Sequence, residues 1–198
     1  MKKHLSLFFL SSAFLLASCA GKTPQADLTL EERLKNPLFT ERYAEEMVGR
    51  MVDLEMRKDP ILENERMKKF VDYTRTKWLS EAKEAKKEQR KGIYGPWLTI
   101  GEEVRGEVLY LNDTLFFSTT FDTPPGPSLH VFLSTVTDPR QGPFPDETSI
   151  DLGELPSPYG AQAIPVPKDE SWETYQTAVL WDTKIQRLYS FAQLQQQP

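Results

Sequence analysis

The chain has 198 residues, a formal net charge of −5 and a single cysteine, Cys19. This length suits one ordinary domain with an appendage, or two small units. One cysteine excludes an internal disulfide and a thiolate metal cluster. Residues 27–91 contain 16 basic and 15 acidic residues, whereas residues 92–198 contain 5 basic and 14 acidic. Because nucleic acid requires a basic surface, the acidic second half argues against a nucleic-acid partner.

The first 18 residues have the pattern of an export signal. MKK is cationic, and the apolar run LSLFFLSSAFLLA is shorter than the roughly 20 residues that a membrane-spanning helix needs. The junction LASC at residues 16–19 resembles the lipobox of bacterial lipoproteins. This resemblance implies cleavage after residue 18 and attachment of acyl chains, palmitate among them, to Cys19. The alternative is an ordinary secretory signal with an incidental cysteine.

The residue after the cysteine bears on the location of the protein. In lipoproteins an aspartate there favours retention in the inner membrane, and this chain has Ala20. The resemblance therefore implies the outer membrane of a host with two membranes, and otherwise the outer face of the cytoplasmic membrane. Residues 19–28 would form a lipidated tether that spans at most about 30 Å. The expected membrane partner is the bilayer that takes up the acyl chains.

Residues 29–92 are predicted to be helical. Thr29 and Glu32 have the spacing of a capping box, Pro37 is expected to end that short element, and Thr40 is expected to cap a second helix. Apolar residues then recur at helical spacing on either side of the break at Asp59-Pro60, as Tyr43, Met47, Val48, Met51 and Leu54 and as Met67, Phe70, Val71, Thr74 and Trp78.

The end of this region differs from its beginning. SEAKEAKKEQRKG contains strong helix formers without an apolar stripe, and it predicts a solvated helix end closed by Gly92. The methionines could in principle ligate haem. Because Met47, Met51 and Met67 occupy core positions of amphipathic helices, packing is the favoured interpretation.

From Tyr94 onward, short runs of β-branched and aromatic residues lie between turns rich in proline and glycine: VRGEVLYL, TLFFSTTF, SLHVFLSTV, AQAIPV, TAVLWDT and RLYSFAQL. This spacing predicts an antiparallel sandwich or barrel, and with the helices an α+β fold. Alternation places Leu129, Val131 and Leu133 on one face of their strand. We also expect Trp181 to be buried between the sheets.

Three of these segments resemble a known family. GPSLHVFLS, DLGELPSPYGAQAIPVP and YQTAVLWDTKIQRLYSFAQL are similar, in this order, to the DM-thirteen domain, a β-sandwich related to the DOMON domains and often described as an electron-transfer module. The resemblance covers about Trp97 to Leu194, within a domain assigned to residues 93–198. Its motif positions are occupied by Gly126, Pro127, Leu152, Gly153, Gly160, Gln162 and Trp181. Where the family typically has cysteine this chain has Asp182, and this departure weakens the redox role that the resemblance implies.

His130 is the only histidine after the predicted cleavage site. It could act as a general base, an axial ligand or an acid sensor. The favoured interpretation is a half-exposed strand residue. Because the strand-rich half contains no methionine that could serve as a second axial ligand, we expect no bound haem and no other cofactor. Carboxylates in or beside the loop TDPRQGPFPDETSID could bind calcium, but their spacing is not that of an EF-hand and favours a solvated loop: Asp138, Asp146, Glu147 and Asp151.

No sequence signature of a serine triad, a phosphate-binding loop or a zinc site is evident, and the sequence predicts no enzyme. We expect a lipid-anchored protein of the cell envelope whose sandwich is a non-catalytic binding or interaction module for an envelope protein or a small ligand. The candidate binding residues are His130, Gln162, Trp181 and Asp182. The alternative is a redox or electron-transfer module, which the family resemblance implies.

Overall fold

The computed structural model describes residues 28–168 and 174–196, so Cys19 and the predicted signal lie outside the described residues. The helical elements are α1 (Leu30–Arg33), α2 (Pro37–Met56), the 3-10 turn η1 (Pro60–Glu63), α3 (Glu65–Gln89) and η2 (Pro139–Gln141). The strands are β1 (Ile93–Pro96), β2 (Glu107–Leu111), β3 (Thr114–Phe117), β4 (Leu129–Ser134), β5 (Ile150–Glu154), β6 (Gln162–Pro165), β7 (Thr177–Asp182), β8 (Arg187–Gln193) and β9 (Gln195–Gln196). The predicted α+β class, helices followed by a β-sandwich, is confirmed.

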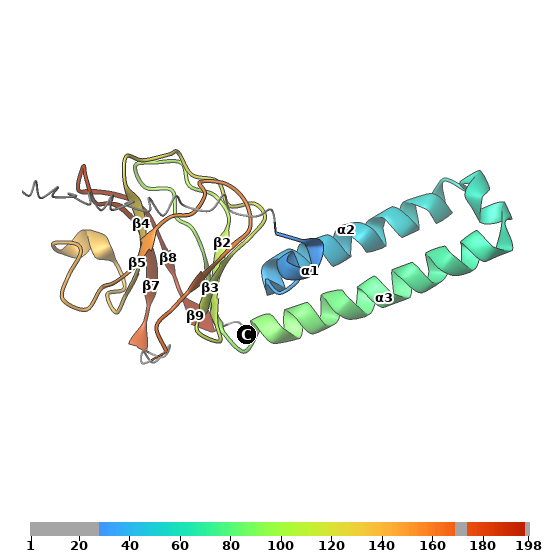
Figure 1. Cartoon of the computed structure of the whole chain (residues 1–198), viewed down its shortest axis with the longest axis horizontal. Coiled ribbons are helices and arrows are strands. Elements are labelled where there is room, and N and C mark those ends of the chain that lie inside the picture. The colour runs from blue at the N-terminus through green and yellow to red at the C-terminus, as the bar shows by residue number, and fades with distance from the viewer. Residues whose placement is uncertain (1–27, 169–173, 197–198) are drawn as a thin grey trace, which may run out of the picture.

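The strands form two antiparallel sheets (Figure 1). One has the order β6-β3-β2-β1-β9, and the other has the order β5-β4-β7-β8. The main core lies between them and includes Leu129, Val131 and Leu133, as their alternation predicts. The strands β1, β5 and β9 were not predicted, because β1 and β5 each contain a glycine, which weakens a strand pattern, and β9 has two residues.

Helices α2 and α3 form an antiparallel hairpin that projects away from the sandwich (Figure 1). The ring of Tyr43 meets that of Trp78 edge-on, with 4.9 Å between centroids. Arg75 donates to Glu55 across the same interface at 2.7 Å. The predicted helical face is thus largely confirmed, but Phe70 was wrongly included, since it is 57% exposed. No helix among residues 28–168 and 174–196 has the length and apolar character needed to cross a membrane.

The start of α2 differs from the prediction. The capping box of Thr29 and Glu32 is present at the start of α1. Pro37, which was expected to end that short element, is instead the first residue of α2. Asn36 caps it, because its side chain accepts the first free backbone N–H groups and proline is well suited to the first helical position. Thr40 is no cap; its hydroxyl donates to the carbonyl oxygen of Leu34 at 2.6 Å.

The end of α3 is also less solvated than predicted. Ala82, Ala85 and Gln89 are buried on the face that meets α2 near the sandwich. Alanine gives no strong apolar stripe in a sequence, yet its small side chain allows two helices to approach closely. The lysines between these positions and Glu84 remain exposed, as predicted for a helix surface.

Trp181 does not lie between the sheets, which corrects the prediction. It is half-buried on the outer face of the second sheet, where Phe132, Val179 and Phe191 form a separate apolar cluster. Phe144, from the loop that follows η2, covers this cluster, with 5.3 Å between its ring centroid and that of Trp181. Strand alternation puts Trp181 on the same face as Val179, but it cannot show which face of β7 looks inward.

Candidate functional site

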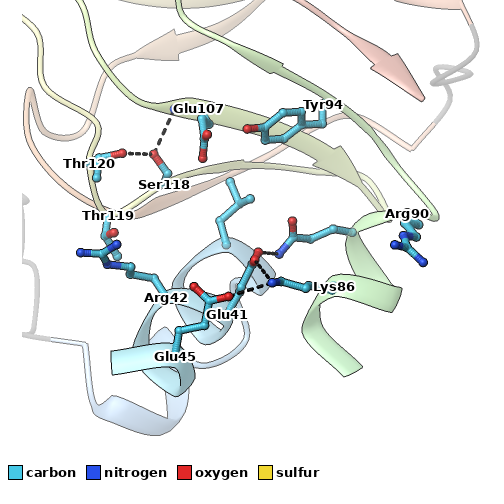
Figure 2. A pocket seen from close by; sticks show the side chains of 12 residues that line it. Glu41, Arg42, Glu45, Lys86, Arg90, Tyr94, Glu107, Ser118, Thr119 and Thr120 are labelled. Carbon is cyan, nitrogen blue, oxygen red and sulfur yellow. Dashed lines mark hydrogen bonds and ion pairs between the residues drawn. The ribbon is translucent and has the colours of Figure 1, made fainter. Parts of the chain in front are cut away.

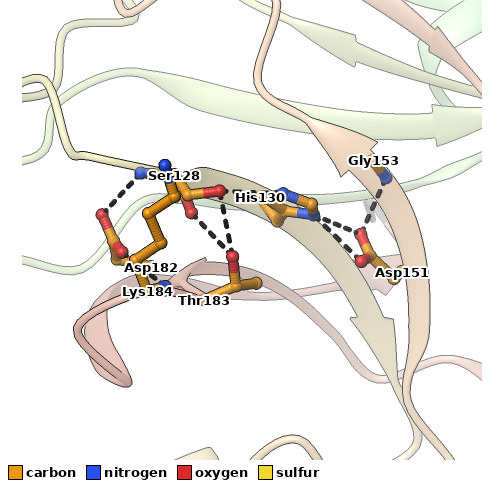
Figure 3. Close-up of polar contacts among 7 residues, drawn as sticks. All are labelled: Ser128, His130, Asp151, Gly153, Asp182, Thr183 and Lys184. Carbon is orange, nitrogen blue, oxygen red and sulfur yellow. Dashed lines mark hydrogen bonds and ion pairs between the residues drawn. The ribbon is translucent and has the colours of Figure 1, made fainter.

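The outer face of the second sheet holds the only described histidine in a chain of polar contacts (Figure 3). His130 on β4 is half-exposed, as the sequence analysis favoured. Its Nδ1 lies 2.9 Å from Asp151 Oδ2 on the neighbouring strand β5. Its Nε2 lies 3.3 Å from the Ser128 hydroxyl, which also accepts a hydrogen bond from Thr183 at 3.0 Å. The backbone N–H of Gly153 fixes the carboxylate of Asp151.

Ser128, His130 and Asp151 are linked in the same order as the serine nucleophile, the histidine base and the carboxylate of a catalytic triad. Sequence analysis missed it because Asp151 comes from another strand. Acyl transfer also needs donors aimed at a developing oxyanion. The backbone N–H of Ser128 cannot take this part, since it already donates to Asp182 at 3.1 Å. We therefore interpret the contacts as a polar link between β4, β5 and the turn after β7.

Asp182 has a structural position, although the sequence marked it as a candidate binding residue. Its side chain is fully buried and accepts hydrogen bonds from three backbone N–H groups, those of Ser128, Lys184 and Ile185. Burial alone would raise the pKa of this carboxyl, but the three donors hold it below its ordinary value. A side chain at Gly126 would lie 2.5 Å from the Asp182 carboxylate, so the turn before β4 packs directly on it.

We predict that Asp182→Asn lowers the free energy of unfolding by about 2 kcal/mol at neutral pH, because an amide cannot accept all three hydrogen bonds. The lower pKa in the folded chain means that the carboxylate contributes fully above about pH 4 and loses its contribution as the pH falls below that. The difference between parent and variant should therefore shrink toward pH 3 in urea titrations. Asp59→Asn is the control, since Asp59 caps one exposed backbone N–H and asparagine caps equally well. A cost that is the same for both variants would contradict the structural role.

The remaining predicted residues do not join His130 in one site. Gln162 is buried at the start of β6, and its side chain holds the turn at Ser157 through 3.0 and 2.6 Å hydrogen bonds. The calcium candidates make separate contacts: Asp138 pairs with Arg140, Asp146 caps the turn at Thr148, Asp151 binds His130, and Glu147 is exposed. Within the described chain, no three His, Cys, Asp or Glu residues gather in a way that could hold a metal ion.

A cavity of about 410 Å³ lies where the hairpin meets the outer face of the first sheet (Figure 2). We call it the junction pocket. Glu107 and Tyr94 line it from β2 and β1, and Glu41, Lys86 and Arg90 line it from the helical side. Leu38 anchors the helices beneath it by packing on Leu109 and Leu111 of the sheet.

The two walls of the junction pocket differ electrostatically. On the helical wall, the Lys86 ammonium is neutralised by Glu45 at 2.7 Å and Glu41 at 3.2 Å. On the sheet wall, burial raises the pKa of Tyr94, and so does the neighbouring carboxylate of Glu107. The phenol therefore stays protonated, so it can donate to that carboxylate. Glu107 forms no ion pair with any described residue, and neither does Arg90 at the rim.

Sequence analysis missed this pocket. Tyr94 and Glu107 are diagonal neighbours on antiparallel strands, because Tyr94 pairs with Leu109 and Pro96 pairs with Glu107. That proximity follows from the register, and β1 itself was not predicted. The one available signal was Glu107 at the start of an otherwise apolar strand, on the same side as Leu109 and Leu111.

Comparison with known proteins bears on the sandwich. No match is found among curated proteins or among solved structures. Residues 99–194 match the family model described as Electron transfer DM13, the same domain that the sequence motifs resemble. This segment runs from just after β1 to the residue before β9 and contains the candidate His130 and Asp182. The sandwich of this chain therefore contains a DM13 domain over residues 99–194.

Proposed function

We propose that this protein is a lipoprotein of the cell envelope, anchored through Cys19, whose DM13 domain and helical hairpin together form a binding module. The export signal and the lipobox-like LASC support the anchor, with Ala20 favouring the outer membrane of a host with two membranes. Otherwise the anchor lies in the outer face of the cytoplasmic membrane.

The junction pocket is the observation that carries the binding function. A cavity of 410 Å³ has the size of a small-ligand site, and ligands bind preferentially where two structural units meet. The polar groups that line it converge from four elements, which is the arrangement that gives a site specificity. The side chains of His130, Asp151 and Asp182 already hydrogen-bond to other protein groups, so they have less hydrogen-bonding capacity left for a ligand.

The binding function can be tested on protein purified from its own envelope. Thr119→Trp places an indole where the half-buried threonine lines the junction pocket. Native mass spectrometry should show a small-molecule adduct on the parent and none on Thr119→Trp. Equal adducts on both proteins, or none on the parent, would count against the pocket as the binding site.

The lipid anchor has its own test. Cys19→Ser removes the atom that would carry the acyl chains, and we expect it to abolish incorporation of labelled palmitate and release the protein from membranes. The control is Ser18→Ala, because alanine also fits the residue before a cleavage site. In palmitate labelling and cell fractionation this variant should still incorporate palmitate and remain with the membranes. Continued labelling of Cys19→Ser would contradict lipid attachment at this residue.

A redox or electron-transfer role is the second candidate, favoured by the description of the matched family. It would require a group that accepts an electron. The position that the resemblance assigns to a cysteine holds Asp182, whose carboxylate is engaged by backbone N–H groups. Visible absorption bands in the protein isolated from its host, with bleaching by dithionite, would favour this role over simple binding.

A further inference from the structure

We propose that the junction pocket binds a small zwitterion, a free amino acid or a short peptide, with its ammonium on Glu107 and its carboxylate on Arg90. This inference rests on the proposed binding function and names the class of ligand. It follows from which charges in the pocket are already neutralised and which are not.

The ammonium subsite is the sheet wall. Glu107 is half-buried beside the Tyr94 phenol, and its carboxylate pairs with no cation among the described residues. A carboxylate removed from water in this way gains more from a bound cation than an exposed one. The Tyr94 ring lies beside it (Figure 2), and an aromatic ring is itself attractive to a cation.

The carboxylate subsite is Arg90. This residue caps the end of α3, lines the junction pocket and is exposed, and Figure 2 places it on the same side of the pocket as Tyr94. Its guanidinium has no acidic partner in the described part of the chain, whereas Lys86 on the same helix is held by two glutamates. Arginine binds carboxylates through two parallel hydrogen bonds. Arg42, the third cation that lines the pocket, pairs with Glu46 at 2.7 Å, so Arg90 is the cation that is free to receive a carboxylate.

The overall charge balance favours a zwitterion over a simple ion. The pocket is lined by three carboxylates and three cationic side chains: Glu41, Glu45 and Glu107, and Arg42, Lys86 and Arg90. Because these charges cancel, a multivalent cation would be repelled by one set and a multivalent anion by the other. Figure 2 places the hydroxyl groups of Ser118 and Thr120, 3.0 Å apart, on the other side of Glu107 from Tyr94, where the exposed Thr120 can accept a hydrogen bond from the bound ammonium. The volume of 410 Å³ accommodates a dipeptide with some water.

Binding of L-alanyl-L-alanine tests the proposal. Residues 19–198 with Cys19→Ser contain every described element, and amide shifts in NMR titrations report which side of the pocket is occupied. We expect dialanine to shift the amides of Tyr94, Glu107 and Arg90. N-acetyl-dialanine lacks the ammonium and dialanine amide lacks the carboxylate, and each should bind at least about tenfold more weakly. Alanine and tetra-alanine show which length fits.

Two variants assign the ends. Glu107→Gln should remove the preference for dialanine over its N-acetyl form, and Arg90→Gln should remove the preference over its amide, each without affecting the other. Arg57→Gln at the far end of α2 is the matched control, since its side chain is 79% exposed. Equal affinity for all three compounds, or no shift with millimolar dialanine, would overturn the zwitterion. If dialanine fails while the envelope adduct still depends on Thr119, the ligand class is wrong and the binding function stands.

Discussion

Trp97→Ala should lower the free energy of unfolding by about 3–5 kcal/mol, more than the same change at Trp181. Trp97 is 5% exposed and lies in the core between the sheets. Its ring stacks on Phe117 with centroids 5.6 Å apart and also meets Phe121. Removing it leaves a cavity that is enclosed by both sheets and that neighbouring side chains cannot fill easily.

Trp181→Ala is the matched variant. Trp181 is half-buried under Phe144 on the outer face, so the loop that carries Phe144 can settle into the space and water can enter. We expect a cost of about 1–2 kcal/mol in urea unfolding. Trp97→Phe keeps an aromatic ring in the core but removes the indole N–H. Because Trp97 Nε1 is buried and finds no acceptor among the described residues, the loss of this N–H should cost little free energy of unfolding. A larger loss at Trp181 than at Trp97 would show that the assignment of the two faces is wrong.

The error over Trp181 shows what strand alternation can establish. It groups residues by face reliably, as the inward Leu129, Val131 and Leu133 confirm. It identifies the inward face only where the other face is polar. On β7 and β8 both faces are apolar, because the loop after η2 covers the outer one, and nothing local to the strand shows that cover.

The same limit explains why the fold was more predictable than the junction pocket. Capping signals and strand runs are local, and they indicated a helical region followed by a sandwich. The pocket depends on the register that brings Tyr94 beside Glu107, and on the helices that bring Arg90 to its rim. Those contacts arise only when α2 packs on the sheet, and the residue that joins them, Asn36, is an ordinary asparagine in the sequence.

Asn36→Asp should destabilise the protein by about 3 kcal/mol because this one amide satisfies groups in both halves. Its Oδ1 accepts from the backbone N–H groups of Leu38 and Phe39, and so caps α2. Its Nδ2 donates to the carbonyl oxygens of Phe117 and Gln162, which face each other at the end of the β3–β6 ladder. A carboxylate would keep the cap but would turn a buried negative charge toward two carbonyl oxygens.

Asn64 provides the control because it caps α3 with the same two hydrogen bonds at 3.0 and 3.3 Å, but in an exposed position. Asn64→Asp should be neutral or slightly stabilising, since aspartate caps as well and its charge suits a helix N-terminus. Substitution by alanine should cost about 1 kcal/mol at Asn64 and clearly more at Asn36, where two carbonyl oxygens also lose their donor. Equal costs at the two positions in urea unfolding would mean that Asn36 only caps its helix. In that case the hairpin would be held on the sheet by Leu38 alone, and the junction pocket would lack the fixed geometry that selective binding requires.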